Sequence, residues 1–283
     1  MLSKRLIKHL ENLLSEKIIS TKSLSGGDIN EVFLLTTNNR EMVVKVNSVF
    51  KFHGMFKAEA RGLQEFIDAA IFKIPEVLLF GKDADVSFLL LEYIKSGNKT
   101  RDFWSIFGER LANLHKQSKP YFGFEGDNYI GSLPQYNSKY SSASEFYITQ
   151  RLQPQFEMAI KRGFSFSSLD SFYVAIENEI SDEVSSLIHG DLWSGNFMID
   201  INGFPCLIDP AVAYAPREMD ISMMHLFGGF EHELFEVYND IFPLIDGWKK
   251  RMEIWQLYYL LVHLNLFGDS YLPQIQSILK KYS

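Results

Sequence analysis

Hydrophobic positions recur at helical spacing at the start of the chain and give way to strand-like runs soon afterwards. Leucines alternate with charged residues in MLSKRLIKHLENLL, which predicts an amphipathic helix over residues 1–14. Residues 24–46 hold two β-rich runs joined by the polar turn Thr37–Arg40, the pattern of a hairpin. Apolar residues at helical spacing then predict a helix over 56–70, and VSFLLLEYI predicts a buried strand over 86–94.

Helical patterns dominate from Asp102 onward and are interrupted by one β-rich island. The island NFMIDINGFPCLID carries Asn202-Gly203, a strong signal for a two-residue turn of type I′. A Gly- and Asn-rich loop is expected before Ser142, and helices are predicted over 102–118, 144–163, 167–180 and from about Pro216 to the end. We therefore expect an α+β fold, with an antiparallel β-sheet and one main helix in residues 1–94 and a mostly helical domain with an embedded hairpin in residues 95–283.

The island has a chemical consequence if Asn202 and Gly203 are its two turn residues. Ile201 then faces Phe204, and in the same register Asn196 faces Asp209 at the open end of the hairpin. Directly opposed side chains have Cβ atoms about 4.5–5.5 Å apart, which suits two oxygen ligands of one magnesium ion. Asn196 and Asp209 are therefore the predicted metal ligands.

Asp191 lies five residues before Asn196, in a loop opened by His189 and Gly190. The resulting pattern, H-x-D-x-x-x-x-N, is the catalytic-loop spacing of kinases, in which the aspartate accepts the proton of the attacking hydroxyl. Asp191 is the predicted base, whereas His189 is expected to support the loop. The alternative is that Asp191 and Asn196 only form turns and that Asp209 caps a following element.

Composition narrows the class of protein. The 28 Lys and Arg and 35 Asp and Glu residues give a formal charge of −7, which argues against broad binding of nucleic acid or an anionic membrane. The single cysteine, Cys206, excludes an internal disulfide and indicates a reducing compartment. The N-terminus lacks the pattern of a signal peptide, and Trp255–Phe267 is too short to span a bilayer. A folded cytoplasmic protein is expected.

Two charged residues stand where apolar ones are expected. Lys45 lies in an apolar strand, and Glu59 lies beside Ala60 and Leu63 on the apolar face of the helix over 56–70. Buried charges require partners, so the two are predicted to pair with one another. The alternative is that both extend to solvent.

The string HGDLWSGN, followed by LIDPA and FGGF, closely resembles the fructosamine-3-kinase (ketosamine-3-kinase) family, which is related to aminoglycoside and choline kinases. The similarity runs along almost the whole chain, through SGGDIN, VVKVN, FKAEARGL, LLLEYI, NYIGSLPQYN and RLQPQ. It implies a two-lobed protein-kinase-like fold, ATP and Mg²⁺ as cofactors, and phosphorylation of the 3-hydroxyl of a ketosamine, which would initiate deglycation.

The resemblance also implies roles on the nucleotide side. Lys45 and Glu59 would orient the α- and β-phosphates, and the backbone N–H groups of Gly26 and Gly27 would contact phosphate. The backbone from Glu92 to Ile94 would hydrogen-bond adenine. A plain turn at the glycines and a simple strand end at LEYI are the alternatives.

On the acceptor side, Trp193 could stack on the sugar ring or belong to the core. Two rival functions differ from the ketosamine kinase: a kinase of the same fold acting on an aminoglycoside, choline or an amino alcohol, and a catalytically inactive nucleotide-binding protein. The joint presence of all the predicted catalytic and phosphate-binding side chains argues against the second rival. The sequence does not indicate an oligomeric state.

Overall fold

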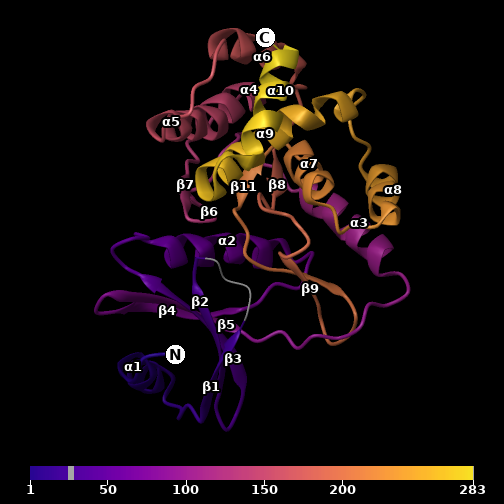
Figure 1. The fold of residues 1–283 in the computed structure, drawn as a ribbon. Helices are drawn as coiled ribbons and strands as arrows, with labels where there is room; N and C mark the ends of the chain where they lie inside the picture. The colour runs from indigo at the N-terminus through magenta and orange to yellow at the C-terminus, as the bar shows by residue number, and fades with distance from the viewer. Residues whose placement is uncertain (25–28, 283) are drawn as a thin grey trace. The chain divides into compact units, whose positions relative to one another are not determined.

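The computed structural model describes residues 1–24 and 29–282, and the chain divides into two compact units. Unit 1 comprises Met1–Lys99 and Met198–Ile208, and unit 2 comprises Thr100–Phe197 and the chain from Asp209 onward. The boundary expected after residue 94 thus falls inside unit 1, and unit 1 also includes most of the hairpin that was expected in the helical domain. Figure 1 shows the fold coloured along the chain.

Unit 1 is built on a five-stranded sheet of order β1-β2-β3-β5-β4 in which every neighbouring pair is antiparallel. The predicted hairpin is confirmed, with Thr36 opposite Glu41 and a turn closed by the N–H of Thr37 on the carbonyl of Arg40. The strands are β1 (Ser20–Leu24), β2 (Glu31–Thr36), β3 (Glu41–Ser48), β4 (Val77–Asp83) and β5 (Val86–Glu92), and the helices are α1 (Lys4–Leu14) and α2 (Met55–Ala69).

The predicted amphipathic N-terminal helix is α1, and it packs on the sheet. Its leucines Leu6 and Leu10 are buried in one cluster with Met42 and Val44 of β3. The hydroxyl of Ser3 accepts from the N–H of Leu6 and caps the helix. Alternation along β3 then directs Lys45 to the opposite face of the sheet from Val44, in register with Leu89 of β5.

The predicted β-island forms a hairpin of β9 (Phe197–Ile199) and β10 (Pro205–Leu207), but its turn differs from the prediction. The N–H of Gly203 donates to the carbonyl of Asp200, and the N–H of Asp200 donates to the carbonyl of Phe204. The loop therefore has three residues, and the last, Gly203, has φ +87°. This is a type I turn followed by a left-handed glycine, rather than a type I′ turn.

The cause of this turn is the side chain of Asp200. Its Oδ1 accepts from the N–H groups of Asn202 and Phe204, each at 2.9 Å, which favours the three-residue loop. Counting back from the Asp200–Phe204 pair places Ile208, not Asp209, opposite Asn196. The predicted direct opposition of Asn196 and Asp209 is thus wrong, and both residues lie just outside the paired strands.

Unit 2 is mostly helical, and its core surrounds α9 (Trp248–Phe267). This helix is buried along most of its circumference, which is typical of a central helix. The remaining helices are α3 (Phe103–His115), α4 (Ala143–Phe146), α5 (Gln153–Lys161), α6 (Leu169–Glu179), α7 (Glu218–Phe227), α8 (His232–Ile241) and α10 (Leu272–Tyr282), with a short 3₁₀ turn at Asp269–Tyr271.

Unit 2 also contains structure that the sequence patterns did not predict. The expected loop before Ser142 contains a hairpin of β6 (Asn128–Ile130) and β7 (Leu133–Gln135), with Asn128 opposite Gln135. Strands β8 (Ser186–Ile188) and β11 (Ala213–Ala215) pair antiparallel. The predicted helix over 144–163 is interrupted by a π-helical segment, Tyr147–Leu152. The short strands lack an alternating pattern long enough to detect.

Candidate active site

The loop that carries Asp191 connects β8 to β9 and is fixed by Asp220 of α7. The Asp220 carboxylate accepts from the N–H of His189 at 2.7 Å and from that of Gly190 at 2.8 Å. Gly190 has φ +78°, and a Cβ there would lie 2.1 Å from the carbonyl oxygen of Ala211, so only glycine fits. Asp220 therefore braces this loop.

Asp191 and Asn196 are brought together by the loop. The amide Nδ2 of Asn196 donates to Asp191 Oδ2 at 2.9 Å and to the Asp191 carbonyl at 2.8 Å. Because the backbone carbonyl can only accept, the amide nitrogen of Asn196 must face Asp191 and the amide oxygen must point elsewhere. That oxygen has no hydrogen-bond donor among the described residues, and an uncommitted carbonyl oxygen is a suitable ligand for a hard cation.

Asp209 follows β10 and has a left-handed backbone, with φ +55°. Aspartate tolerates this conformation better than most residues, but strained backbone of this kind persists only where the surroundings enforce it. Its charge acts on Asp191, since it contributes to raising the pKa of that carboxyl. Asp209 therefore lies in the electrostatic range of the predicted base, although not in the predicted register with Asn196.

Burial dominates the electrostatics of Asp191. Although the residue keeps some contact with solvent, burial is the main cause that raises its pKa to about 7, and the negative charges of Asp209 and Asp220 contribute in the same direction. The hydrogen bond from Asn196 acts in the opposite direction and favours the ionised form. The ionised state that a general base requires is therefore disfavoured by the protein around it.

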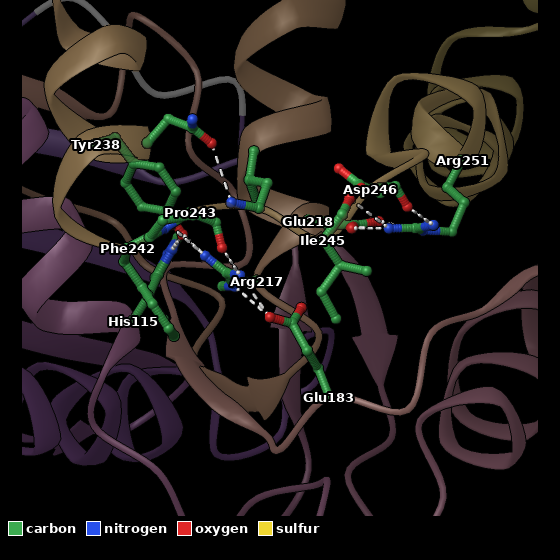
Figure 2. A network of polar contacts seen from close by, with 12 residues as sticks. His115, Glu183, Arg217, Glu218, Tyr238, Phe242, Pro243, Ile245, Asp246 and Arg251 are labelled. Carbon is green, nitrogen blue, oxygen red and sulfur yellow. Dashed lines mark hydrogen bonds and ion pairs between the residues drawn. The ribbon is translucent and has the colours of Figure 1, made fainter.

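The support of Asp220 extends through a network that no local sequence pattern indicates, and Figure 2 shows its members His115, Tyr238, Arg217 and Glu183. His115, at the end of α3, places Nε2 3.2 Å from Asp220 and Nδ1 2.9 Å from the hydroxyl of Tyr238. Arg217 donates to that hydroxyl and to Glu183. The Tyr238 hydroxyl can then donate to Nδ1, which leaves the Nε2 proton for Asp220.

A second ion pair shown in Figure 2 anchors the neighbouring turn of α7. Arg251 of α9 donates to both carboxylate oxygens of Glu218, at 3.0 and 2.6 Å, and the indole of Trp255 donates to the same carboxylate at 2.7 Å. Glu218 is almost fully buried, so these three donors satisfy a carboxylate that would otherwise be costly. The start of α7, and with it Asp220, is thereby held in place.

Trp193 lies on the surface of the loop, with 42% of its area exposed, so the alternative that it belongs to the core is wrong. Its indole covers Gly195, where a Cβ would lie 2.2 Å from the ring. The adjacent Ser194 contacts Gly229 of FGGF closely enough that a Cβ on Gly229 would lie 2.6 Å from the Ser194 Cβ. An exposed aromatic ring thus stands two residues from Asp191.

Lys45 and Glu59 form the predicted ion pair within unit 1. Lys45 Nζ lies 2.6 Å from Glu59 Oε1, and both side chains are largely buried. The alternative in which both extend to solvent is wrong. Since α2 carries Glu59 and β3 carries Lys45, the pair fixes the orientation of a buried cation on this face of the sheet.

The other residues predicted to bind the nucleotide are Glu92, Ile94, Gly26 and Gly27. Glu92 ends β5, and its carboxylate pairs with Lys73 at 2.7 Å, whereas Ile94 is buried just beyond the strand. The segment after Ile94 bonds to the hairpin of β9 and β10, since the N–H of Gly97 donates to the carbonyl of Ile199. Gly26 and Gly27 lie outside the described residues.

Residues 1–24 and 29–282 contain neither a cluster of metal-binding side chains nor a helix that could span a membrane. No three His, Cys, Asp or Glu side chains in that part of the chain gather as a metal site. A cation beside Asp191 would therefore need the Asn196 amide oxygen and oxygens from a substrate or water, in addition to one or two carboxylates such as that of Asp209. None of the helices in the same residues is long and apolar enough to cross a membrane.

Comparison with known proteins decides the family. A model of the fructosamine kinase family matches residues 2–283. The chain belongs to the fructosamine kinase family. A relative from Enterococcus faecium, provisionally named a ketoamine kinase, is 38% identical, and the match covers 96% of this chain and 99% of the relative. The chloroplastic protein-ribulosamine 3-kinase of Oryza sativa subsp. japonica is 35% identical, with coverage of 94% and 79%.

Solved structures with a similar fold are consistent with membership of this family. A crystal structure from Haemophilus somnus, provisionally named a fructosamine-3-kinase, superposes with a TM-score of 0.89 at 27% identity and covers 99% of this chain and 97% of that one. Aminoglycoside phosphotransferase APH(4)-Ia has a TM-score of 0.64 at 16% identity, with full coverage of both chains, which shows a shared fold alone. The predicted protein-kinase-like α+β fold is confirmed, and the protein is an ATP-dependent phosphotransferase.

Proposed function

We propose that the protein transfers the γ-phosphoryl group of ATP to a sugar hydroxyl of a ketosamine of the fructosamine or ribulosamine type. The observation that carries the proposal is the hydrogen bond from Asn196 Nδ2 to Asp191, which leaves the amide oxygen available beside a half-buried carboxylate. The family match and the names of the ketoamine and ribulosamine kinases support the acceptor class.

In this proposal Asp191 is the general base, and Asn196 and Asp209 hold Mg²⁺. Bound magnesium would neutralise charge on the nucleotide phosphates. The Lys45–Glu59 pair orients the α- and β-phosphates, the backbone N–H groups of Gly26 and Gly27 contact phosphate, and the backbone from Glu92 to Ile94 binds adenine. Trp193 stacks on the sugar of the acceptor.

The chemical step requires one proton acceptor from the protein. The acceptor hydroxyl gives its proton to an Asp191 carboxylate oxygen, and its own oxygen forms the new bond to the γ-phosphorus. The bond from that phosphorus to the β,γ-bridging oxygen breaks, and ADP leaves. Asp191 later releases the proton to solvent, with which it keeps partial contact.

An acceptor screen tests this function. ADP release is measured with fructosyl-lysine, ribulosyl-lysine, an aminoglycoside, choline and ethanolamine at equal concentrations. We expect turnover on the ketosamines only. Turnover on choline or an aminoglycoside with none on either ketosamine would refute the acceptor class but retain the kinase, and nucleotide binding without turnover on any acceptor would favour an inactive nucleotide-binding protein.

Replacing Trp193 by alanine tests the stacking role. Loss of a ring-stacking contact is expected to raise KM for the ketosamine about three- to tenfold, with KM for ATP unchanged. Trp193→Phe keeps an aromatic face and serves as the control, and it is expected to recover most of the affinity. An unchanged ketosamine KM in Trp193→Ala, or an equal rise in both KM values, would contradict this role.

Location and partners follow from the same proposal. A small-molecule ketosamine or a glycated amine is the expected partner, without nucleic acid or membrane, in line with the formal charge of −7. A cytoplasmic location is proposed because the only cysteine, Cys206, is fully buried and no disulfide is needed.

A further inference from the structure

Three buried amide side chains lie together at the β6–β7 hairpin of unit 2. Asn128 is 5% exposed, Gln135 is 2% exposed and Asn137 is 1% exposed. Asn128 Oδ1 accepts from Gln135 Nε2 at 2.8 Å and from Asn137 Nδ2 at 2.9 Å. Burying an amide side chain costs free energy unless its hydrogen bonds are made, so three buried amides together indicate that they bond to specific groups nearby.

Two of the amides bond to the backbone of the segment after Asp209. Gln135 Nε2 donates to the carbonyl of Ala211 at 3.1 Å, and Asn128 Nδ2 donates to the carbonyl of Val212 at 2.9 Å. Two consecutive carbonyls, two and three residues beyond Asp209, are thus held by side chains of one short hairpin. The amide cluster therefore fixes the chain immediately downstream of a proposed magnesium ligand.

Ala211 also links this segment to the loop of Asp191. Its N–H donates to the carbonyl of His189 at 2.9 Å, while its own carbonyl accepts from Gln135 and lies against Gly190. Any displacement of Ala211 would shift Asp209 relative to the 189–191 loop, because only Pro210 separates it from Asp209. Gln135 is thus connected through the single residue Ala211 both to Asp209 and to the loop of Asp191.

The far side of the cluster is rigidly anchored. Tyr258 of α9 donates its hydroxyl to Gln135 Oε1 at 2.8 Å, and Arg151 donates to Asn137 Oδ1 at 2.8 Å. The Arg151 guanidinium is buried and lies 4.6 Å from the centre of the Phe146 ring. The oxygen and the nitrogen of all three amide side chains are thus hydrogen-bonded, and buried networks satisfied in this way resist rearrangement.

We propose that Gln135 is a positioning residue for phosphoryl transfer, which acts through Ala211 to hold Asp209 in its left-handed conformation at a fixed distance from Asp191. The inference rests on the proposed function for its catalytic consequence. Without the bond from Gln135, the strained backbone of Asp209 loses one of the contacts that enforce it, so the segment relaxes and the magnesium ligands separate.

Gln135→Met keeps the length of the side chain and removes its hydrogen bonds. We expect the Mg²⁺ concentration for half-maximal activity to rise about tenfold, with KM for the ketosamine within twofold of the wild type. Independently of activity, amide hydrogen exchange at residues 209–213, measured by mass spectrometry without metal or nucleotide, is expected to quicken about tenfold.

Tyr147→Phe is the matched control, because it removes a buried hydroxyl that bonds to the carbonyls of Ile254 and Trp255 rather than to the amide cluster or to Ala211. We expect it to lower the melting temperature without changing the Mg²⁺ requirement or the exchange at 209–213. If Gln135→Met does not fold, Gln135→Met/Tyr258→Phe replaces it, since this pair leaves no hydroxyl unpartnered at residue 258.

An unchanged Mg²⁺ requirement, unchanged exchange, or equal changes in Tyr147→Phe would overturn the proposal. Failure of the proposed function has a different signature: the wild type itself would show no turnover on any ketosamine. The exchange measurement would then still decide whether Gln135 holds the segment after Asp209.

Discussion

Asp191→Asn is expected to reduce kcat by about 10²–10⁴-fold, because the amide cannot take the proton of the acceptor hydroxyl. The fold is expected to persist, since Asn196 also donates to the backbone carbonyl of residue 191, a bond that does not depend on the side chain. Binding of ATP should change by less than threefold. The measurements are steady-state ADP release and calorimetric titration with ATP.

The exposed Asp182 provides the control, because Asp182→Asn removes the same charge from the surface of unit 2. It should leave kcat unaltered. Turnover of Asp191→Asn within threefold of the wild type would remove Asp191 from its proposed role, whereas loss of ATP binding together with turnover would point to a damaged fold.

The difference in melting temperature between the wild type and Asp191→Asn is expected to depend on pH. Burial raises the pKa of Asp191 to about 7 in the folded protein, so the native state binds more protons than the unfolded chain between about pH 4 and pH 7. This contribution to stability is present at low pH and is lost as pH rises through 7. Asp191→Asn should therefore exceed the wild type in melting temperature at pH 8, with the difference shrinking toward pH 4.

Catalysis follows the opposite course, since the base must be ionised. The kcat/KM of the wild type is expected to rise with pH up to about 7 and then level.

The melting temperatures of the wild type and Asp191→Asn are measured in EDTA, because a cation beside the carboxyl favours its ionised form and lowers its pKa. A melting difference independent of pH would show that Asp191 is not the group responsible.

Asp209→Asn is expected to produce the second large loss, about 10²-fold or more in kcat, with a raised Mg²⁺ requirement. Asparagine adopts the left-handed conformation as readily as aspartate, so the backbone at φ +55° should be preserved. The loss would then arise from the missing charge on the metal. Activity is titrated with Mg²⁺ at saturating ATP and ketosamine.

Asp209→Ala is the companion variant, because it removes the charge and also strains the backbone. It should lower the melting temperature, whereas Asp209→Asn should not. A kcat within threefold and an unchanged Mg²⁺ requirement in Asp209→Asn would refute the proposed ligand, and recovery of full activity at high Mg²⁺ would show that Asp209 affects metal affinity alone.

Local patterns in the sequence were sufficient for the elements whose burial is periodic. The N-terminal helix, the hairpin around Thr37–Arg40 and the Lys45–Glu59 pair were predicted correctly, because an amphipathic stripe or a charge in an apolar run has few structural solutions. The proximity of Asp191 and Asn196 also followed from a short spacing within one loop.

The register of the β-island was not predictable from the Asn-Gly pair alone. The side chain of Asp200 captures two backbone N–H groups and selects a three-residue loop, and such competition between turn types is decided by a few hydrogen bonds. Pairing across long separations was missed for a related reason. His115 meets Asp220, and Gln135 meets Ala211, only because the whole of unit 2 folds, so neighbouring sequence gives no signal.

The hairpin of β9 and β10 limits how this enzyme could be divided or recombined. Neither unit is a continuous stretch of polypeptide, since Met198–Ile208 belongs with the first 99 residues. A fragment truncated at Lys99 would lack the strands that bond to Lys73 and Gly97 and would expose those backbone groups to water. Exchange of unit 1 between relatives would thus require two coordinated transplants, one of residues 1–99 and one of residues 198–208.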